Sequence, residues 1–195
     1  NAFSELQESF SQRNNGIKVN ITSNCLDQVA QNEKDSHGGE SDENFTIKGL
    51  YPVYQTITPS IYGHISYAQN IQGYSNILTR AFPGENRNNR PIALRPWNST
   101  SGLFGYSVDE YPIAASFEGG HDWELNRPVS TALVPTWEQG IQGRQISGLY
   151  SAISVGDRFL VLPLSKKSYS LPYGSPYFKV SPAGRLAPGG PIGSA

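Results

Sequence analysis

The sequence has 195 residues, enough for one domain that buries roughly two-thirds of its unfolded surface without a metal or a disulfide. Its 20 glycines, 14 prolines and 11 tyrosines predict many turns and short strands and few long helices. No apolar run approaches the ~20 residues of a membrane-spanning helix, which excludes helical membrane proteins. The single cysteine, Cys25, excludes an intrachain disulfide, and the lack of methionine even at position 1 indicates a piece of a longer precursor.

The formal net charge of -1 conceals an asymmetry between the two parts of the chain. Residues 1–50 carry four Lys and Arg against eight Asp and Glu, whereas residues 51–195 carry eleven against eight. Every basic residue from position 80 to position 158 is an arginine, the side chain suited to forked contacts with phosphate. Ordinary charge scatter on a solvated surface gives the same pattern, so the charges alone do not choose between the two interpretations.

The chain divides into three segments by composition. Residues 1–49 are polar and rich in Asn and Ser, and we interpret them as an N-terminal segment or linker. Residues 50–170 contain the short apolar runs expected of a folded domain, and residues 171–195 form a Pro- and Gly-rich tail.

Within the domain the elements follow from apolar spacing and from glycine and proline positions. In chain order we first expect a short amphipathic helix before Gly73 and a strand or edge segment over 91–97. Two strands follow, one over 105–111 that is ended by Pro112 and one over 130–135. The last elements are a helix over 136–153 with Thr136 as N-cap and a buried strand over 157–162 that is ended by Pro163. The predicted fold class is α+β, with a small antiparallel sheet and few short helices.

A cluster of acids lies in the middle of this domain, although charged residues make up only 16% of the chain. Asp109 and Glu110 are adjacent on a predicted strand, so their side chains face opposite sides and only one of them enters a given site. Glu118 follows eight residues later, and Glu138 stands near the start of a predicted helix. A base on a strand and a metal ligand on the next helix is the arrangement of a one-metal phosphodiesterase site, in which a hard cation such as Mg²⁺ or Mn²⁺ binds oxygen ligands.

Two other interpretations of the acids stay open. A glycosidase would use two carboxyl groups roughly 5–10 Å apart, in a groove lined by aromatic residues without a nearby arginine. A non-catalytic, β-rich binding module would carry Asp109 and Glu138 as solvent-facing acids that lie far apart.

The histidines and tryptophans each have a structural and a functional interpretation. His64 is expected to be a packed or capping histidine, with a DNA contact as the alternative. His121 directly follows Gly119 and Gly120, so a role in proton transfer or phosphate binding competes with that of an ordinary loop histidine. Three tryptophans suit either packing or stacking on bases, namely Trp97, Trp123 and Trp137. The histidines lack the spacing of a zinc site.

Three blocks of sequence resemble a known family. "SVDEYPIAASFEGG" is similar to the Asp-Glu-aromatic-Pro and Glu-Gly-Gly signature of the NucA/NucB deoxyribonucleases. "GHISYAQNIQGYSNILTR" resembles the family's upstream segment, and "VPTWEQGIQGRQISGLY" followed by "DRFLVL" resembles its functional helix and the next strand. The resemblance covers roughly residues 50–165 and implies a ββα-metal-like nuclease core that hydrolyses DNA with Mg²⁺ or Mn²⁺.

The resemblance also implies roles for individual residues. Asp109 stands where the family has the acid that activates water, and Glu138 stands where it has the metal ligand, with Asp109 as a further candidate ligand. Glu110 and His121 complete the candidate catalytic set. The candidate substrate-binding residues are Arg127, Arg144, Gln142 and Glu118.

The sequence departs from the family at two positions where secreted members often carry cysteine. Val108 and Ser116 stand there instead, which favours a toxin or effector domain that works inside a reducing cell. We therefore expect a secreted protein or one delivered into a target cell, with DNA as its substrate and no membrane partner. A toxin would also have a cognate immunity protein, with an acidic surface to cover the arginine-rich face.

Overall fold

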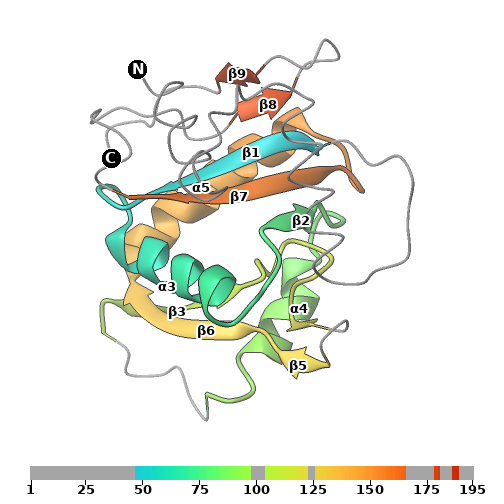
Figure 1. Ribbon diagram of the computed structural model, residues 1–195. Helices are drawn as coiled ribbons and strands as arrows, with labels where there is room; N and C mark the ends of the chain where they lie inside the picture. The colour runs from blue at the N-terminus through green and yellow to red at the C-terminus, as the bar shows by residue number, and fades with distance from the viewer. Residues whose placement is uncertain (1–46, 98–103, 123–125, 166–177, 181–185, 189–195) are drawn as a thin grey trace.

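The computed structural model describes residues 47–97, 104–122, 126–165, 178–180 and 186–188 as an α+β arrangement of strands and three helices (Figure 1). The predicted class is confirmed. No helix in these ranges is long and apolar enough to cross a membrane.

The larger sheet has five strands in the order β2-β7-β1-β8-β9. Its two central strands, β1 (Ile47–Tyr54) and β7 (Arg158–Leu164), pair in parallel, and nearly every residue in them is buried. Such continuous burial is typical of parallel strands that are covered on both faces. The outer strands pair antiparallel to their neighbours: β2 (Ile77–Thr79), β8 (Phe178–Val180) and β9 (Leu186–Pro188). The sheet is therefore mixed, whereas the sequence predicted an antiparallel one.

A second layer is made by β3 (Tyr106–Tyr111) and β6 (Ser130–Pro135), which pair antiparallel along their whole length. Helix α3 (Pro59–Asn70) lies between this pair and the larger sheet (Figure 1), and its buried residues Ile61, Ile65 and Ala68 belong to the main core. Helix α5 (Thr136–Ala152) follows β6 directly and packs against both layers. A two-residue ribbon, β4 (His121–Asp122) and β5 (Arg127–Pro128), completes the described strands.

The expected elements on either side of the acid cluster are confirmed. Strand β3 ends at Tyr111, just before Pro112, and β6 and α5 cover the predicted ranges. The predicted N-cap is wrong, because Pro135 caps α5 and Thr136 is its first residue. The helix before Gly73 is longer than expected because it begins at Pro59, where the fixed backbone angle of proline suits a first helical position. Strand β7 continues through Pro163 to Leu164. Two strands of the larger sheet, β8 and β9, come from the predicted tail.

The prediction for residues 91–97 is wrong. Residues Asn86–Ala93 form helix α4, with Pro91 inside it, and a turn follows as far as Trp97. The helix is held by contacts that a single sequence does not reveal. Asn89 Nδ2 donates hydrogen bonds to the carbonyl oxygens of Ala114 (2.9 Å) and Ser116 (3.1 Å), so tertiary contacts outweigh the local preference.

The Gly-Gly pair after Glu118 has a structural explanation. A Cβ on Gly119 would lie 2.6 Å from the carbonyl oxygen of Ile113 and 2.8 Å from Cα of Ala114, both of them backbone atoms. Gly120 has a positive φ of 82°, which favours glycine, and lies against Asn89 of α4. The pair therefore allows the chain after β3 to pack closely on itself and on α4.

This close approach predicts that Gly119→Ala lowers the free energy of unfolding by about 1–3 kcal/mol, because the added methyl group forces backbone apart. Gly143→Ala is the matched control, since nothing lies within 4 Å of its added Cβ and alanine is favoured in a helix interior by about 0.5–1 kcal/mol. Chemical denaturation of both variants measures the difference. A Gly119→Ala chain as stable as the parent would contradict the packing described.

Candidate active site

Asp109 is the centre of a buried polar group between three elements. It lies on β3 with 1% of its surface exposed. Its Oδ2 is 2.6 Å from Nδ1 of His64 on α3, and its Oδ1 accepts a hydrogen bond of 2.7 Å from Nε2 of Gln139 on α5. Nε2 of His64 is in turn 3.0 Å from the hydroxyl of Ser130 on β6. Because the carboxylate only accepts, Nδ1 of His64 carries the proton that it donates to Asp109.

His64 is buried on α3, as expected of a packed histidine, but its contact with Asp109 was not predicted from the sequence, where a DNA contact was the alternative. Its partner Asp109 is 45 positions away, so no local motif links them. One signal was available: the buried face of α3 consists of Ile61, His64, Ile65 and Ala68, at helical spacing. A polar residue in such an apolar stripe needs a partner across the interface.

The order Asp109, His64, Ser130 is that of a serine-hydrolase triad, so the position of the serine matters. Ser130 is 7% exposed and does not line the cleft described below. A nucleophile must reach its substrate, and this hydroxyl lies behind the histidine instead. We therefore interpret Ser130 as the partner that fixes the imidazole ring.

Glu138 lies in the first turn of α5 and is also 1% exposed. Its Oε2 accepts hydrogen bonds from the backbone N–H groups of Ser60 (2.9 Å) and Ile61 (3.0 Å). These are N–H groups of the first turn of α3, which have no partner inside their own helix. The carboxylate thus lies between the positive ends of two helices, and its Oε1 is buried without a partner among the described residues.

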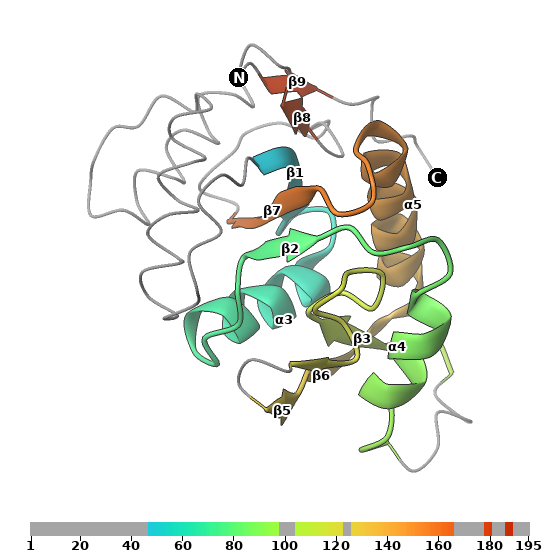
Figure 2. The same cartoon turned by 90° about the vertical axis from the view of Figure 1, so that its right-hand side faces the viewer.

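Glu110 faces the opposite side of β3 from Asp109, as the alternation of strand side chains requires. Figure 2 shows α4 on the side of the β3–β6 pair away from α3. From α4, Nη1 of Arg90 donates to both carboxylate oxygens of Glu110, at 2.7 and 2.6 Å. Nη2 of Arg90 donates to the hydroxyl of Ser107 and to the carbonyl oxygen of Val108. The two adjacent acids therefore have separate partners on separate helices.

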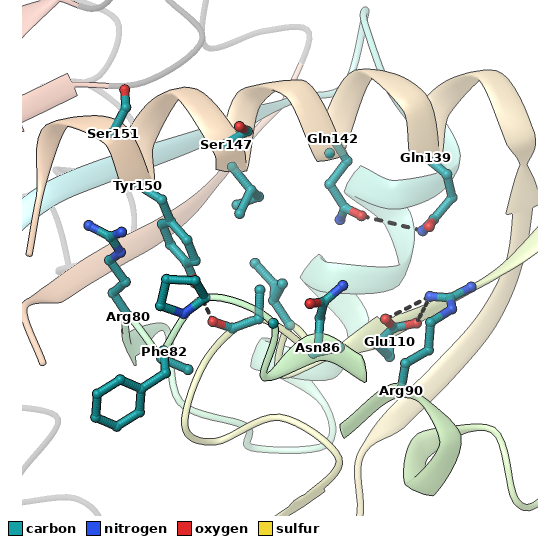
Figure 3. A pocket seen from close by; sticks show the side chains of 18 residues that line it. Arg80, Phe82, Asn86, Arg90, Glu110, Gln139, Gln142, Ser147, Tyr150 and Ser151 are labelled. Carbon is teal, nitrogen blue, oxygen red and sulfur yellow. Dashed lines mark hydrogen bonds and ion pairs between the residues drawn. The ribbon is translucent and has the colours of Figure 1, made fainter. Parts of the chain in front are cut away.

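A cleft of about 620 Å³ opens beside these residues. One wall is α5, and the other is formed by α4 and the segments around Arg80 and Ala114. At one end lie Gln139 and Gln142 from α5, opposite the Arg90–Glu110 ion pair (Figure 3). Gln139 lines the cleft and also contacts Asp109, so it links the buried carboxylate to the open space.

Residues 70–162, which contain β3, α5 and most of the cleft, match the family model Deoxyribonuclease NucA/NucB. This segment of the chain matches the NucA/NucB deoxyribonuclease family. The resemblance predicted from the three sequence blocks is confirmed. No curated protein matches the chain.

The NucA/NucB match contains every candidate site residue, and the structure brings some of them together. Glu110 and Gln142 line the cleft at the same end as Gln139. Gln139 also donates hydrogen bonds to Asp109 and to Gln142. His64 lies six residues before the matched segment begins, although it contacts Asp109 directly.

Four other candidates lie elsewhere. Both carboxylate oxygens of Glu118 accept a hydrogen bond from the backbone N–H of Thr79 (2.9 and 3.1 Å). These bonds hold the loop that contains Glu118 against β2. Burial raises the pKa of Glu118, and the hydrogen bonds from Thr79 oppose this change. His121, Arg127 and Arg144 do not line the cleft.

Arg127 packs its guanidinium over the ring of Tyr74, 3.8 Å from the centroid, and pairs with Asp122 at 3.4 Å. Arg144 is exposed on α5. The arginines that do line the cleft are Arg80 and Arg90.

The resemblance to NucA/NucB nucleases implies a metal ion bound by oxygen ligands. One buried carboxylate oxygen of this site is suited to bind such an ion. No group of three or more His, Cys, Asp or Glu side chains in the described ranges is arranged to hold a metal ion. Mg²⁺, however, is usually bound by one or two carboxylates, with water and substrate phosphate completing its shell. The buried Oε1 of Glu138 has no hydrogen-bond donor among the described residues, so a cation would supply the partner that this oxygen lacks.

Burial raises the pKa of Glu110 to about 7, even though the charge and the hydrogen bonds of Arg90 lower it. Between pH 4.5, which is the ordinary pKa of this carboxyl, and about pH 7, the folded chain therefore binds a proton that the unfolded chain has released. The free energy of unfolding should fall as pH rises through this window, by at most about 1.4 kcal/mol per pH unit for one proton.

Glu110→Gln should remove this part of the pH dependence, because the amide does not titrate. Chemical denaturation between pH 5 and pH 8 measures the slope for the parent and the variant. Glu85→Gln, a partly exposed acid next to α4, serves as the control and should keep the parent slope. Equal slopes for all three chains would show that Glu110 is ionised throughout the window.

Proposed function

We propose that this NucA/NucB chain is a metal-dependent endonuclease that hydrolyses phosphodiester bonds of DNA with little sequence specificity. The observation that supports it best is the buried carboxylate of Asp109. One of its oxygens is held by His64 and the other by Gln139, which lines a cleft that also contains two arginines. Such a carboxylate is oriented on both oxygens and stands next to a site that suits a polyanion.

In the proposed reaction Asp109 accepts a proton from the water that attacks phosphorus. Gln139 moves away from Oδ1, which frees a lone pair for that proton and admits water from the cleft. His64 is a positioning residue: its Nδ1–H holds Oδ2, and Ser130 holds the ring from the other side. The bond between phosphorus and the leaving oxygen breaks, and that oxygen takes up a proton from solvent.

Glu138 is the residue to which we assign metal binding, through Oε1. Mg²⁺ or Mn²⁺, when bound, neutralises charge that develops on the phosphate. Arg90 lies at the same end of the cleft as Gln139 and offers a second positive charge. Contacts with phosphate carry no sequence information, and a site built from them cuts many sequences.

The delivered-toxin role is part of the same proposal. The two positions where secreted relatives often have cysteine are occupied by buried residues that need no disulfide: Val108 is 1% exposed, and the hydroxyl of Ser116 donates to the carbonyl oxygen of Ile113 at 2.8 Å. A chain without disulfides is suited to a reducing cell. An immunity protein with an acidic surface would be its natural inhibitor.

The two rival functions required features that differ from those observed. A glycosidase groove was expected to lack nearby arginine, but Arg80 and Arg90 line this cleft. A binding module was expected to expose Asp109 and Glu138, but each is 1% exposed. The observations therefore favour the nuclease.

A substrate panel tests the proposal. Duplex DNA, single-stranded DNA and RNA of one mixed sequence are incubated with the purified chain in Mg²⁺, in Mn²⁺ and in EDTA, and the product ends are sequenced. We expect DNA cleavage that requires metal, with cuts distributed over the sequence. Cleavage that persists in EDTA, or cuts confined to one short motif, would contradict the proposal.

A further inference from the structure

The cleft extends well beyond the end that contacts Asp109. Its α5 wall consists of residues 139, 142, 143, 146, 147, 150 and 151, which recur with the helical repeat and therefore form one face of the helix. At 1.5 Å per residue this face is about 18 Å long. A stacked nucleic-acid strand rises 3.4 Å per nucleotide, so the cleft is long enough for about five nucleotides.

The far end of the cleft has its own positive charge. The guanidinium of Arg80 lies over the ring of Tyr150, 5.4 Å from the centroid, and Nη1 donates to the carbonyl oxygen of Ile153. No carboxylate of the described residues forms an ion pair with Arg80, whereas Arg90 at the other end is paired with Glu110. Among the described residues that line the cleft, Glu110 is the only acid.

Exposed aromatic side chains stand beside Arg80. Phe82 lines the cleft at this end (Figure 3), and its side chain is 61% exposed. Its ring meets that of Phe117 edge-on, with centroids 5.7 Å apart and an interplanar angle of 81°. A large apolar ring in water is costly, and a ring held at a fixed angle next to an arginine is the combination that binds a base and its phosphate.

We propose that this end of the cleft is a distal nucleotide subsite, in which Phe82 stacks on a base and Arg80 binds a phosphate several nucleotides from the bond that is cut. The subsite rests on the proposed function because it extends the same cleft. It makes oligonucleotides of about five residues or more the preferred substrate class, since shorter ones do not reach both ends.

Binding to a chain that does not cut provides the test. Fluorescence anisotropy is measured with the Asp109→Asn chain in EDTA and labelled single-stranded oligodeoxynucleotides of 3 and 12 residues. Phe82→Ala and Arg80→Gln, each added to it, should weaken binding of the 12-mer about tenfold, within the range for the loss of one stacked base. Binding of the 3-mer should not change. Gln is used at position 80 because its amide can still donate to Ile153.

The salt dependence separates the two roles. Arg80→Gln should reduce the slope of log affinity against log salt by about 0.7, as expected for one lost phosphate contact on a single strand, while Phe82→Ala should leave the slope unchanged. Phe104→Ala, which changes a 93% exposed ring that does not line the cleft, is the matched control and should bind as the unaltered chain does.

Unaltered 12-mer affinity in both variants, or an equal loss for the 3-mer, would overturn the subsite. Comparison with cleavage separates its failure from that of the proposed function. A parent chain that cuts DNA while the variants bind normally refutes the subsite alone. If the parent cuts nothing but both variants bind the 12-mer more weakly, the nuclease is refuted and the subsite is kept.

Discussion

Asp109→Asn is expected to reduce the rate of DNA cleavage by about 10²–10⁴-fold, the range for loss of a positioned general base. The amide retains the shape of the carboxylate, and its oxygen still accepts the Nδ1–H of His64, so the fold should be preserved. What it loses is the ability to accept the proton of the attacking water. Initial rates on supercoiled plasmid in Mg²⁺, measured beside thermal unfolding of the same samples, give both quantities.

The matched control for this change is Asp157→Asn, the same substitution at a position outside the cleft whose carboxylate accepts the backbone N–H of Ser154 at 2.7 Å. It should cut at the parent rate. His64→Ala tests positioning separately: activity should fall and the pH–rate profile should change, because the carboxylate loses its donor. A folded Asp109→Asn chain that cuts as fast as the parent would exclude Asp109 as the base.

Two substitutions of Glu138 should separate its two roles. Glu138→Ala leaves the N–H groups of Ser60 and Ile61 without their acceptor, so the free energy of unfolding should fall by about 1–3 kcal/mol and cleavage should be lost. Glu138→Gln keeps an oxygen acceptor for α3 but removes the negative charge that binds the cation. Its stability should stay near that of the parent, while the Mg²⁺ concentration needed for cleavage rises and the maximal rate falls.

Thermal unfolding and a Mg²⁺ titration of the cleavage rate, performed on the same preparations, measure these outcomes. If Glu138→Gln cuts DNA as the parent does at every Mg²⁺ concentration, Glu138 only caps α3. The cation would then need a different ligand.

The parts of the molecule with strong local signals could be predicted from the sequence. Strand β3 is bounded by Pro112, and α5 shows helical apolar spacing from Trp137 to Ile153, so both were placed correctly. The family followed from three sequence blocks in order, and the segment that matches it contains two of them complete and most of the third. These signals are local, and a single chain displays them without its neighbours.

The features that could not be predicted depend on contacts between distant residues. His64 meets Asp109 across 45 positions, and Glu138 caps a helix that begins almost 80 positions earlier. Residues 91–97 were predicted as a strand or edge segment, yet Asn86–Ala93 form helix α4, which the hydrogen bonds of Asn89 hold. The arginines of the cleft could not be predicted either: sequence proximity to the acids favoured Arg127 and Arg144 as phosphate ligands, whereas the arginines that line the cleft are Arg80 and Arg90.

The most direct test of the central claim is a time course of supercoiled plasmid cleavage by the parent chain in Mg²⁺, with Asp109→Asn and an EDTA-treated parent sample beside it. The proposed mechanism predicts nicked and then linear plasmid for the parent alone. It would be contradicted if the parent left the plasmid intact in both Mg²⁺ and Mn²⁺. It would equally be contradicted if Asp109→Asn produced nicked plasmid at the parent rate.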